Sequence, residues 1–306
     1  MPKPGKETLD RQLLKEVIAS LLRDKVCTTI SPDVIYLMKK AYAEETSGGA
    51  KEMLKTQIEN VAMAEKRARP VCQSPGFPTV YVKYGGCVNI SDLADVLREE
   101  IVSVTKECFL RPSMVHPLTR KNSGDNSGIG VPNIELAYDS ALDFLEILIS
   151  FKGCGAELGN TLKIFTPAQI GDHANGIKEF VIDTVIKAGG KPCPPFAIGI
   201  GIGGQMDVAA RLSRRAVSTR NWNDRNPDPD LAAMEDELLT MINQLGIGPG
   251  GIGGKTTALA VKIALSHTHT AICPVAINFH CWVARRAGIR LYPDGRREYL
   301  FGEEAR

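Results

Sequence analysis

Residues 191–204 read KPCPPFAIGIGIGG, which predicts a proline-bounded turn, a buried strand and a glycine-rich exit. A helical pattern runs from Thr166 to Gly190 before this strand, and another follows it through Arg215. A strand placed between two helices is typical of an α/β fold.

The remainder of the chain fits the same class. Residues 1–68 predict a mainly helical N-terminal layer, and strand-like runs stand at 79–82 and 270–281. Because no internal repeat and no linker interrupts the chain, we expect one α/β domain over 1–306 whose helical layer packs on a core at 69–306.

Composition limits the classes of function. The 37 basic and 35 acidic residues give a net charge of +2, too weak a field to hold a polyanion, so nucleic acid is a poor first guess. No apolar run approaches the roughly 20 residues of a membrane span, and the N-terminus lacks a signal-peptide pattern, so we expect a cytoplasmic protein. In that reducing compartment the eight cysteines are not expected to form a disulfide framework.

Two glycine motifs suggest nucleotide sites but fit them poorly. Gly199, Gly201 and Gly204 satisfy G-x-G-x-x-G, yet no βαβ unit surrounds them, and the favoured interpretation is a strand whose glycines let another backbone approach. The run GIGPGGIGGKT ends like a phosphate loop, but Pro249 stands where that loop needs its first glycine. Its backbone amides could still face an anion, so carboxylate binding stays open.

Three cysteines share an irregular setting. Cys72 precedes a Pro-Gly turn, Cys193 lies among prolines, and Cys281 ends a strand-like run. Such backbone leaves a thiol pointing away from regular pairing, as cluster ligands often do. Their wide separation resembles no zinc knuckle, and on spacing alone buried structural thiols remain the favoured alternative.

The other cysteines and the histidines give weaker signals. Cys154 is ambiguous between two glycines, and the rest are expected to be structural: Cys27, Cys87, Cys108 and Cys273. His267 and His269 share one face of an extended chain, where a hydrogen-bonded core residue is a more common outcome than a catalyst.

A long polar segment, 111–131, reads RPSMVHPLTRKNSGDNSGIGV and has no periodicity. Loops of this length in compact domains tend to be functional or disordered. Arg111 at its start would by default be a solvated loop arginine.

In order, eight segments between about Glu45 and Ile289 resemble the α component of the class I, iron–sulfur fumarate hydratase and L(+)-tartrate dehydratase family. They are VCQSPG, FLRPSMVHPLTRKNSGDNSG, KGCGAELGN, LKIFTPAQ, GGKPCPPF, IGIGGQMD, LGIGPGGIGGKT and HTHTAICPVAINFHCWVARR. The resemblance implies an α/β fold of the family's N-terminal type, with the helical layer on a mixed-sheet catalytic domain.

The resemblance also implies a cofactor and site residues. The family's three cluster cysteines correspond to Cys72, Cys193 and Cys281, which would hold a [4Fe-4S] cluster whose open iron acts as a Lewis acid. The implied substrate contacts are the Arg111 guanidinium, which fits a carboxylate, the Gln73 amide and the Gly155 backbone, with His269 in the pocket.

The chain departs from the family pattern at two points. Ser74 stands where the family usually has an aspartate near the reacting carbon, and a hydroxyl does not titrate usefully near neutral pH. The chain also ends at Arg306, whereas single-chain members continue into a C-terminal catalytic domain. We therefore expect a β subunit that supplies this domain and, by family resemblance, an α2β2 assembly.

These inferences lead to one expected function and two alternatives. We expect the α subunit of a hydro-lyase that interconverts fumarate and L-malate, with His269 and Ser74 as the catalytic pair. A related dicarboxylate hydratase, acting on L(+)-tartrate or mesaconate, is the nearer alternative. The more distant one is a non-catalytic iron–sulfur protein that has lost activity with the aspartate.

Overall fold

The computed structural model describes residues 10–86 and 89–301, so Cys87 lies outside the described part of the chain. The described residues divide into two compact units. Unit 1 contains 10–31, 60–152 and 285–301, and unit 2 contains 32–59 and 153–284.

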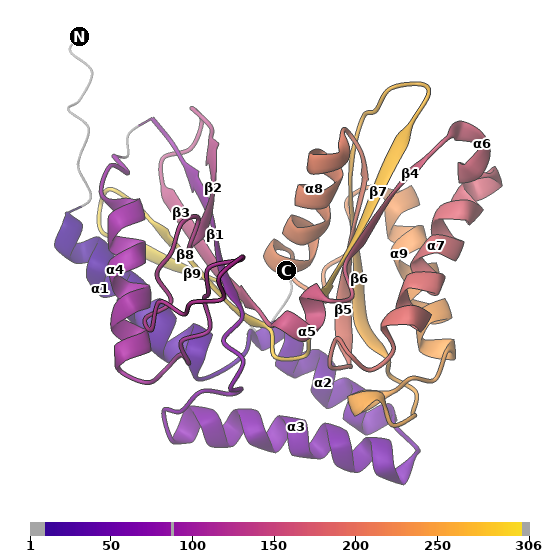
Figure 1. Ribbon diagram of the computed structural model, residues 1–306, viewed down its shortest axis with the longest axis horizontal. Helices are drawn as coiled ribbons and strands as arrows, with labels where there is room; N and C mark the ends of the chain where they lie inside the picture. The colour runs from indigo at the N-terminus through magenta and orange to yellow at the C-terminus, as the bar shows by residue number, and fades with distance from the viewer. Residues whose placement is uncertain (1–9, 87–88, 302–306) are drawn as a thin grey trace. The chain divides into compact units, whose positions relative to one another are not determined.

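Unit 1 is a five-stranded mixed sheet with helices on one face (Figure 1). Its strand order is β2-β1-β3-β8-β9, in which only the β1–β2 pair is parallel. Val80, Ile149 and Ile289 point from neighbouring strands into a core closed by the helices. The elements are α1 (Arg11–Ser20), the π-helix η1 (Leu21–Cys27), β1 (Phe77–Tyr84), α4 (Leu93–Lys106), β2 (Asn133–Tyr138), β3 (Leu145–Lys152), β8 (Arg285–Leu291) and β9 (Arg297–Leu300).

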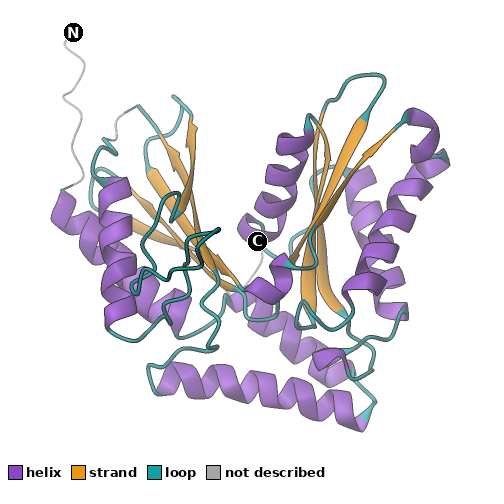
Figure 2. Ribbon diagram, viewed as in Figure 1, coloured by secondary structure: helices purple, strands orange, loops and turns teal. Residues whose placement is uncertain are grey.

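Unit 2 is a four-stranded mixed sheet of order β4-β7-β5-β6. Figures 1 and 2 show helix α8 on one face of this sheet and helices α7 and α9 on the other. Its strands and longer helices are α2 (Pro32–Glu44), β4 (Thr161–Phe165), α7 (Asn175–Ala188), β5 (Phe196–Gly203), α8 (Met206–Thr219), α9 (Pro229–Gln244), β6 (Ala258–Ser266) and β7 (Cys273–His280). Short turns of helix are α5 (Cys154–Glu157), α6 (Pro167–Ile170), η2 (Asp172–Ala174) and η3 (Pro249–Gly251), and α3 (Gly48–Lys66) spans the boundary at residue 59.

The glycines of β5 allow helix α8 to pack directly on the strand. A Cβ added at Gly199 would lie 1.9 Å from the carbonyl oxygen of Ser213, and one at Gly201 would lie 2.0 Å from that of Ala209. Real Cβ atoms cannot come so close to backbone, so only glycine fits here. The interpretation of this motif as a site of close backbone approach is therefore confirmed.

Replacing Gly201 with alanine should push α8 away from the sheet. We expect the free energy of unfolding to fall by about 1–3 kcal/mol, the usual range for overpacking a core. Urea denaturation measures this loss. Gly48→Ala is the control, since a Cβ there meets nothing within 4 Å. Equal stability of Gly201→Ala and the control would contradict the packing argument.

The chain passes between the two compact units at residues 31, 59, 152 and 284, so no single linker marks a boundary, and one α/β domain over 1–306 stays a prediction. The helices of 1–68 are divided between these units. The helix predicted from Thr166 to Gly190 is broken between Ile170 and Asn175, where Gly171, His173 and Ala174 adopt positive φ.

Candidate functional site

Two of the predicted cluster ligands lie at the same end of the unit 2 sheet. Cys193 precedes β5 and Cys281 follows β7, and these antiparallel strands pair Ala197 with His280. The amide of Trp282 approaches the carbonyl oxygen of Cys193 at 3.5 Å. Cys193 is exposed and has a positive φ of 58°, whereas Cys281 is 7% exposed. The sheet thus brings together two cysteines that are remote in sequence.

Gly155 borders the same turn. A Cβ added to it would lie 2.6 Å from the carbonyl oxygen of Lys191 and 3.9 Å from the sulfur of Cys193. Any side chain at this position would displace the Cys193 turn. The neighbouring Cys154 is exposed, so at these two positions it is the backbone of Gly155, and not the Cys154 side chain, that packs tightly against the Cys193 turn.

The glycine-rich loop supports the Cys193 turn. The amide of Gly250 donates to the carbonyl oxygen of Pro194 at 2.9 Å, and the Gln57 side-chain amide donates to the same oxygen at 3.2 Å. A Cβ on Gly251 would lie 3.1 Å from the Cα of Gly190. The loop that resembled a phosphate loop therefore holds the residue next to Cys193.

The anion that this loop faces is a carboxylate of the chain itself. Glu45 is 2% exposed, and its Oε2 accepts the Lys255 amide at 2.8 Å. Its Oε1 accepts the amides of Thr46 and Ser47, each at 2.9 Å. Burial by itself would raise the pKa of Glu45, but the hydrogen bonds from these three amides and the Lys255 charge outweigh it and hold the pKa below its usual value.

The lowered pKa predicts a pH dependence of stability. Because the pKa of Glu45 is lower in the folded chain than in the unfolded chain, its stabilising effect is present above the unfolded value of about 4.3 and is lost as pH falls through the folded value. Glu45→Gln should melt at a lower temperature than the wild type at pH 7, and the difference should shrink below about pH 4. Thermal melts across this range test it, with the exposed neighbour Glu44→Gln as control. A constant difference at all pH values would refute the ionic role.

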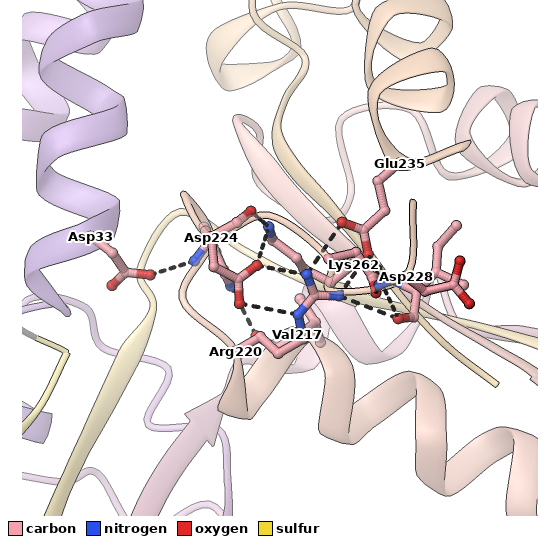
Figure 3. A network of polar contacts seen from close by, with 10 residues as sticks. Asp33, Val217, Arg220, Asp224, Asp228, Glu235 and Lys262 are labelled. Atoms are coloured by element: carbon pink, nitrogen blue, oxygen red, sulfur yellow. Dashed lines mark hydrogen bonds and ion pairs between the residues drawn. The ribbon is translucent and has the colours of Figure 1, made fainter. Parts of the chain in front are cut away.

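A buried polar network supports the strand end that carries Cys281. The Trp222 amide donates to Asp33 at 2.8 Å, its indole nitrogen donates to the Val217 carbonyl oxygen at 2.9 Å, and its ring meets that of His280 edge-on at 5.6 Å. Figure 3 shows the adjoining ionic cluster. We define this cluster as Arg220, Asp224, Glu235 and Lys262.

In unit 1, Cys72 lies half-buried in the turn 72–76 between α3 and β1. The turn is anchored on both sides. Before the turn, the Val71 amide donates to the Cys27 carbonyl oxygen at 3.2 Å, and the Val71 carbonyl oxygen accepts the Asn60 side-chain amide at 2.9 Å. Within the turn, Arg285 donates to the Ser74 carbonyl oxygen. Gln73 is exposed, so its amide is accessible to a ligand.

The segment 111–131 is an ordered loop built around Asn126. This residue is 3% exposed and accepts the amides of Ser113 at 2.8 Å and Met114 at 3.2 Å. Its side-chain amide donates to the Thr105 hydroxyl at 3.0 Å and the Arg111 carbonyl oxygen at 3.2 Å. The Arg111 side chain is exposed on a fixed backbone. The polar, aperiodic sequence of the loop gave no signal for the organising role of Asn126.

His269 lies at the other end of the unit 2 sheet from Cys193 and Cys281. It precedes β7, and its Nδ1 accepts the Ala271 amide at 3.2 Å, while Cys281 follows the last residue of β7. Eight residues at a rise of about 3.3 Å each put roughly 25 Å between the two ends. Within one chain the fold does not bring His269 near these cysteines.

The donor chemistry of the predicted ligands fits an iron–sulfur cluster. Thiolates are its usual ligands, and Cys193 and Cys281 emerge from irregular backbone at one sheet end, while Cys72 belongs to unit 1. Within residues 10–86 and 89–301, no three His, Cys, Asp or Glu side chains are grouped closely enough to hold a metal ion. No helix of the described chain is long and apolar enough to cross a lipid bilayer.

Comparison with known proteins identifies the family. The fumarate hydratase (Fumerase) family matches residues 15–290, so this chain belongs to that family and is a hydro-lyase. It is 41% identical to a Methanocaldococcus jannaschii protein named "Putative L(+)-tartrate dehydratase subunit alpha", over 92% of this chain and 99% of that protein. It is 30% identical to the L(+)-tartrate dehydratase subunit alpha of Escherichia coli, over 92% and 91% of the two chains. A Geobacillus stearothermophilus protein named "Putative fumarate hydratase class I" is 32% identical over 87% of this chain and 53% of its own length.

Proposed function

We propose that this chain is the cluster-bearing α subunit of a [4Fe-4S] hydro-lyase that acts on a small dicarboxylate, with fumarate and L-malate as the first substrate pair. The observation that carries the proposal is the convergence of Cys193, Cys281 and Gly155 at one end of the unit 2 sheet. The glycine-rich loop fixes this end, as a cluster-binding turn requires. The α-subunit names of two relatives support the assignment.

Each proposed residue has a distinct role. Cys72, Cys193 and Cys281 would hold the cluster, which when bound supplies a Lewis acid that polarises a hydroxyl or water. The exposed Arg111 guanidinium binds a substrate carboxylate through two parallel hydrogen bonds, and the exposed Gln73 amide orients the substrate.

The proposed roles of Ser74 and His269 differ from the usual family pattern. The Ser74 hydroxyl donates and accepts hydrogen bonds without ionising near neutral pH, so it orients the reacting water rather than acting as an acid. His269 lies about 25 Å along the sheet from Cys281, so we assign it to a site completed by another chain of the assembly. A β subunit and an α2β2 assembly in the cytoplasm are the proposed context.

L(+)-tartrate is the second candidate substrate because the 41% and 30% identical relatives carry tartrate dehydratase names. Fumarate and tartrate differ at the two carbons beside the carboxylates, whereas the carboxylate contact of Arg111 suits both. A mesaconate hydratase fits the same chemistry, and a non-catalytic iron–sulfur protein is the alternative outside enzymes.

Anaerobic co-purification with the β subunit tests the proposal. The cluster-loaded complex should consume fumarate, L(+)-tartrate or mesaconate, and fumarate loss is followed by its ultraviolet absorbance. Arg111→Gln should raise KM at least about tenfold, since it removes a bidentate carboxylate contact. Arg98→Gln on the preceding helix, whose exposed side chain pairs with Asp95, is the matched control. A loaded complex that turns over none of the three substrates would refute the proposed activity.

A further inference from the structure

Arg285 is a buried cation that donates a hydrogen bond to Ser74. It opens strand β8, is 2% exposed, and donates through Nη2 to the carbonyl oxygen of Ser74. Its Nε is buried and has no hydrogen-bond partner in the described chain, where no carboxylate forms an ion pair with this side chain. A buried guanidinium without a counter-ion is unfavourable, so a fold that retains one calls for an explanation.

A second arginine of β8 shows how a cation on this strand is ordinarily neutralised. Arg290 donates to Glu146 at 2.8 Å and pairs with Glu298 at 3.4 Å. Arg285 lies on the opposite face of the sheet from Arg290, beside its cross-strand neighbour Phe151 in the core. Unlike Arg290, Arg285 forms no ion pair with a carboxylate of the described chain.

The groups near Arg285 do not supply the missing negative charge. Burial raises the pKa of the nearby Cys27 thiol to about 12, against a smaller opposing effect of Arg285, so this thiol is neutral at physiological pH. Ser74 offers only a backbone oxygen to Arg285 and carries no charge of its own. What the guanidinium contacts is the turn 72–76, which carries Cys72.

We propose that Arg285 is a positioning residue for the turn 72–76, and that its uncompensated charge stabilises the negative charge that Cys72 brings there when it ligates the cluster. The hydrogen bond to Ser74 fixes the backbone two residues beyond Cys72. The positive charge favours the more reduced, more negative form of a thiolate-bound cluster. This inference rests on the proposed cluster ligation by Cys72.

The first experiment measures the cluster potential in the anaerobic complex with its β subunit. Arg285→Gln removes the charge and should shift the midpoint potential to a more negative value. Arg285→Lys retains the charge, so its midpoint potential should stay close to that of the wild type. This variant decides the question if Arg285→Gln does not fold. Arg290→Gln, on the same strand, should leave the potential unchanged.

The second experiment needs no cluster. Amide hydrogen exchange of the cluster-free full chain, read by mass spectrometry in a peptide covering 70–78, should be several-fold faster in Arg285→Gln and unchanged in Arg290→Gln. An unchanged exchange rate or an unchanged potential in a folded Arg285→Gln overturns the proposal. If no preparation binds iron, the proposed function fails instead, while the exchange measurement still decides whether Arg285 fixes the turn.

Discussion

Replacing Glu235 with alanine should lower the free energy of unfolding by about 3–5 kcal/mol, because it removes a buried carboxylate from an ionic cluster and leaves two positive charges with one carboxylate. Glu235 is 6% exposed. Its Oε1 accepts from three donors: Arg220 at 2.6 Å, Asn226 at 2.8 Å and the Ile263 amide at 2.7 Å (Figure 3). The variant leaves the charges of Arg220 and Lys262 facing Asp224 alone.

Urea denaturation followed by tryptophan fluorescence measures the loss. The signal reports unit 2, since both tryptophans of the chain, Trp222 and Trp282, belong to it. Asp236→Ala is the matched control on the same helix, because Asp236 pairs with Arg225 in full contact with water, where an ion pair contributes little. If both variants unfold at the same urea concentration, the cluster does not stabilise the unit.

Cys193→Ser should abolish the visible iron–sulfur absorbance of the anaerobic complex, which is the largest functional effect that we expect. A serine oxygen is a poor substitute for a soft thiolate, and the fixed turn gives no other donor the same position. Cys281→Ser, at the same sheet end, should have the same effect. Iron and sulfide content, with the visible spectrum, are the measurements.

Cys108→Ser is the control for this loss. Cys108 is exposed like Cys193 but follows helix α4 in unit 1, and it lies in no predicted ligand segment. We expect this variant to retain the full spectrum. Equal loss in Cys108→Ser and Cys193→Ser would refute the ligand assignment.

The local features of the sheet in unit 2 were predictable from the sequence. An apolar run with alternating glycines indicated a buried strand. Close approach of another backbone explained these glycines better than a nucleotide-binding turn did. The prolines around Cys193 indicated an irregular turn. In each case the residue types restrict the backbone locally, so neighbouring residues alone sufficed for the prediction.

Features that depend on distant residues could not be predicted. Strand β8 follows no glycine or proline turn of its own, and the division into two units depends on strand partners more than 100 residues apart, such as Leu145 with Leu291. Arg285 in the run Ala-Arg-Arg-Ala has the pattern of a surface pair, and only the tertiary contact with Ser74 shows that it is buried. Glu45 and Lys255 likewise meet across 210 positions.

The most direct test of an iron–sulfur hydro-lyase is the relation between cluster content and turnover. A series of anaerobic preparations of the complex, loaded with increasing amounts of iron and sulfide, is assayed for dicarboxylate hydration or dehydration. We predict that the rate rises in proportion to the cluster content and vanishes in Cys193→Ser. A rate that is independent of cluster content, or that survives in this variant, would contradict the account.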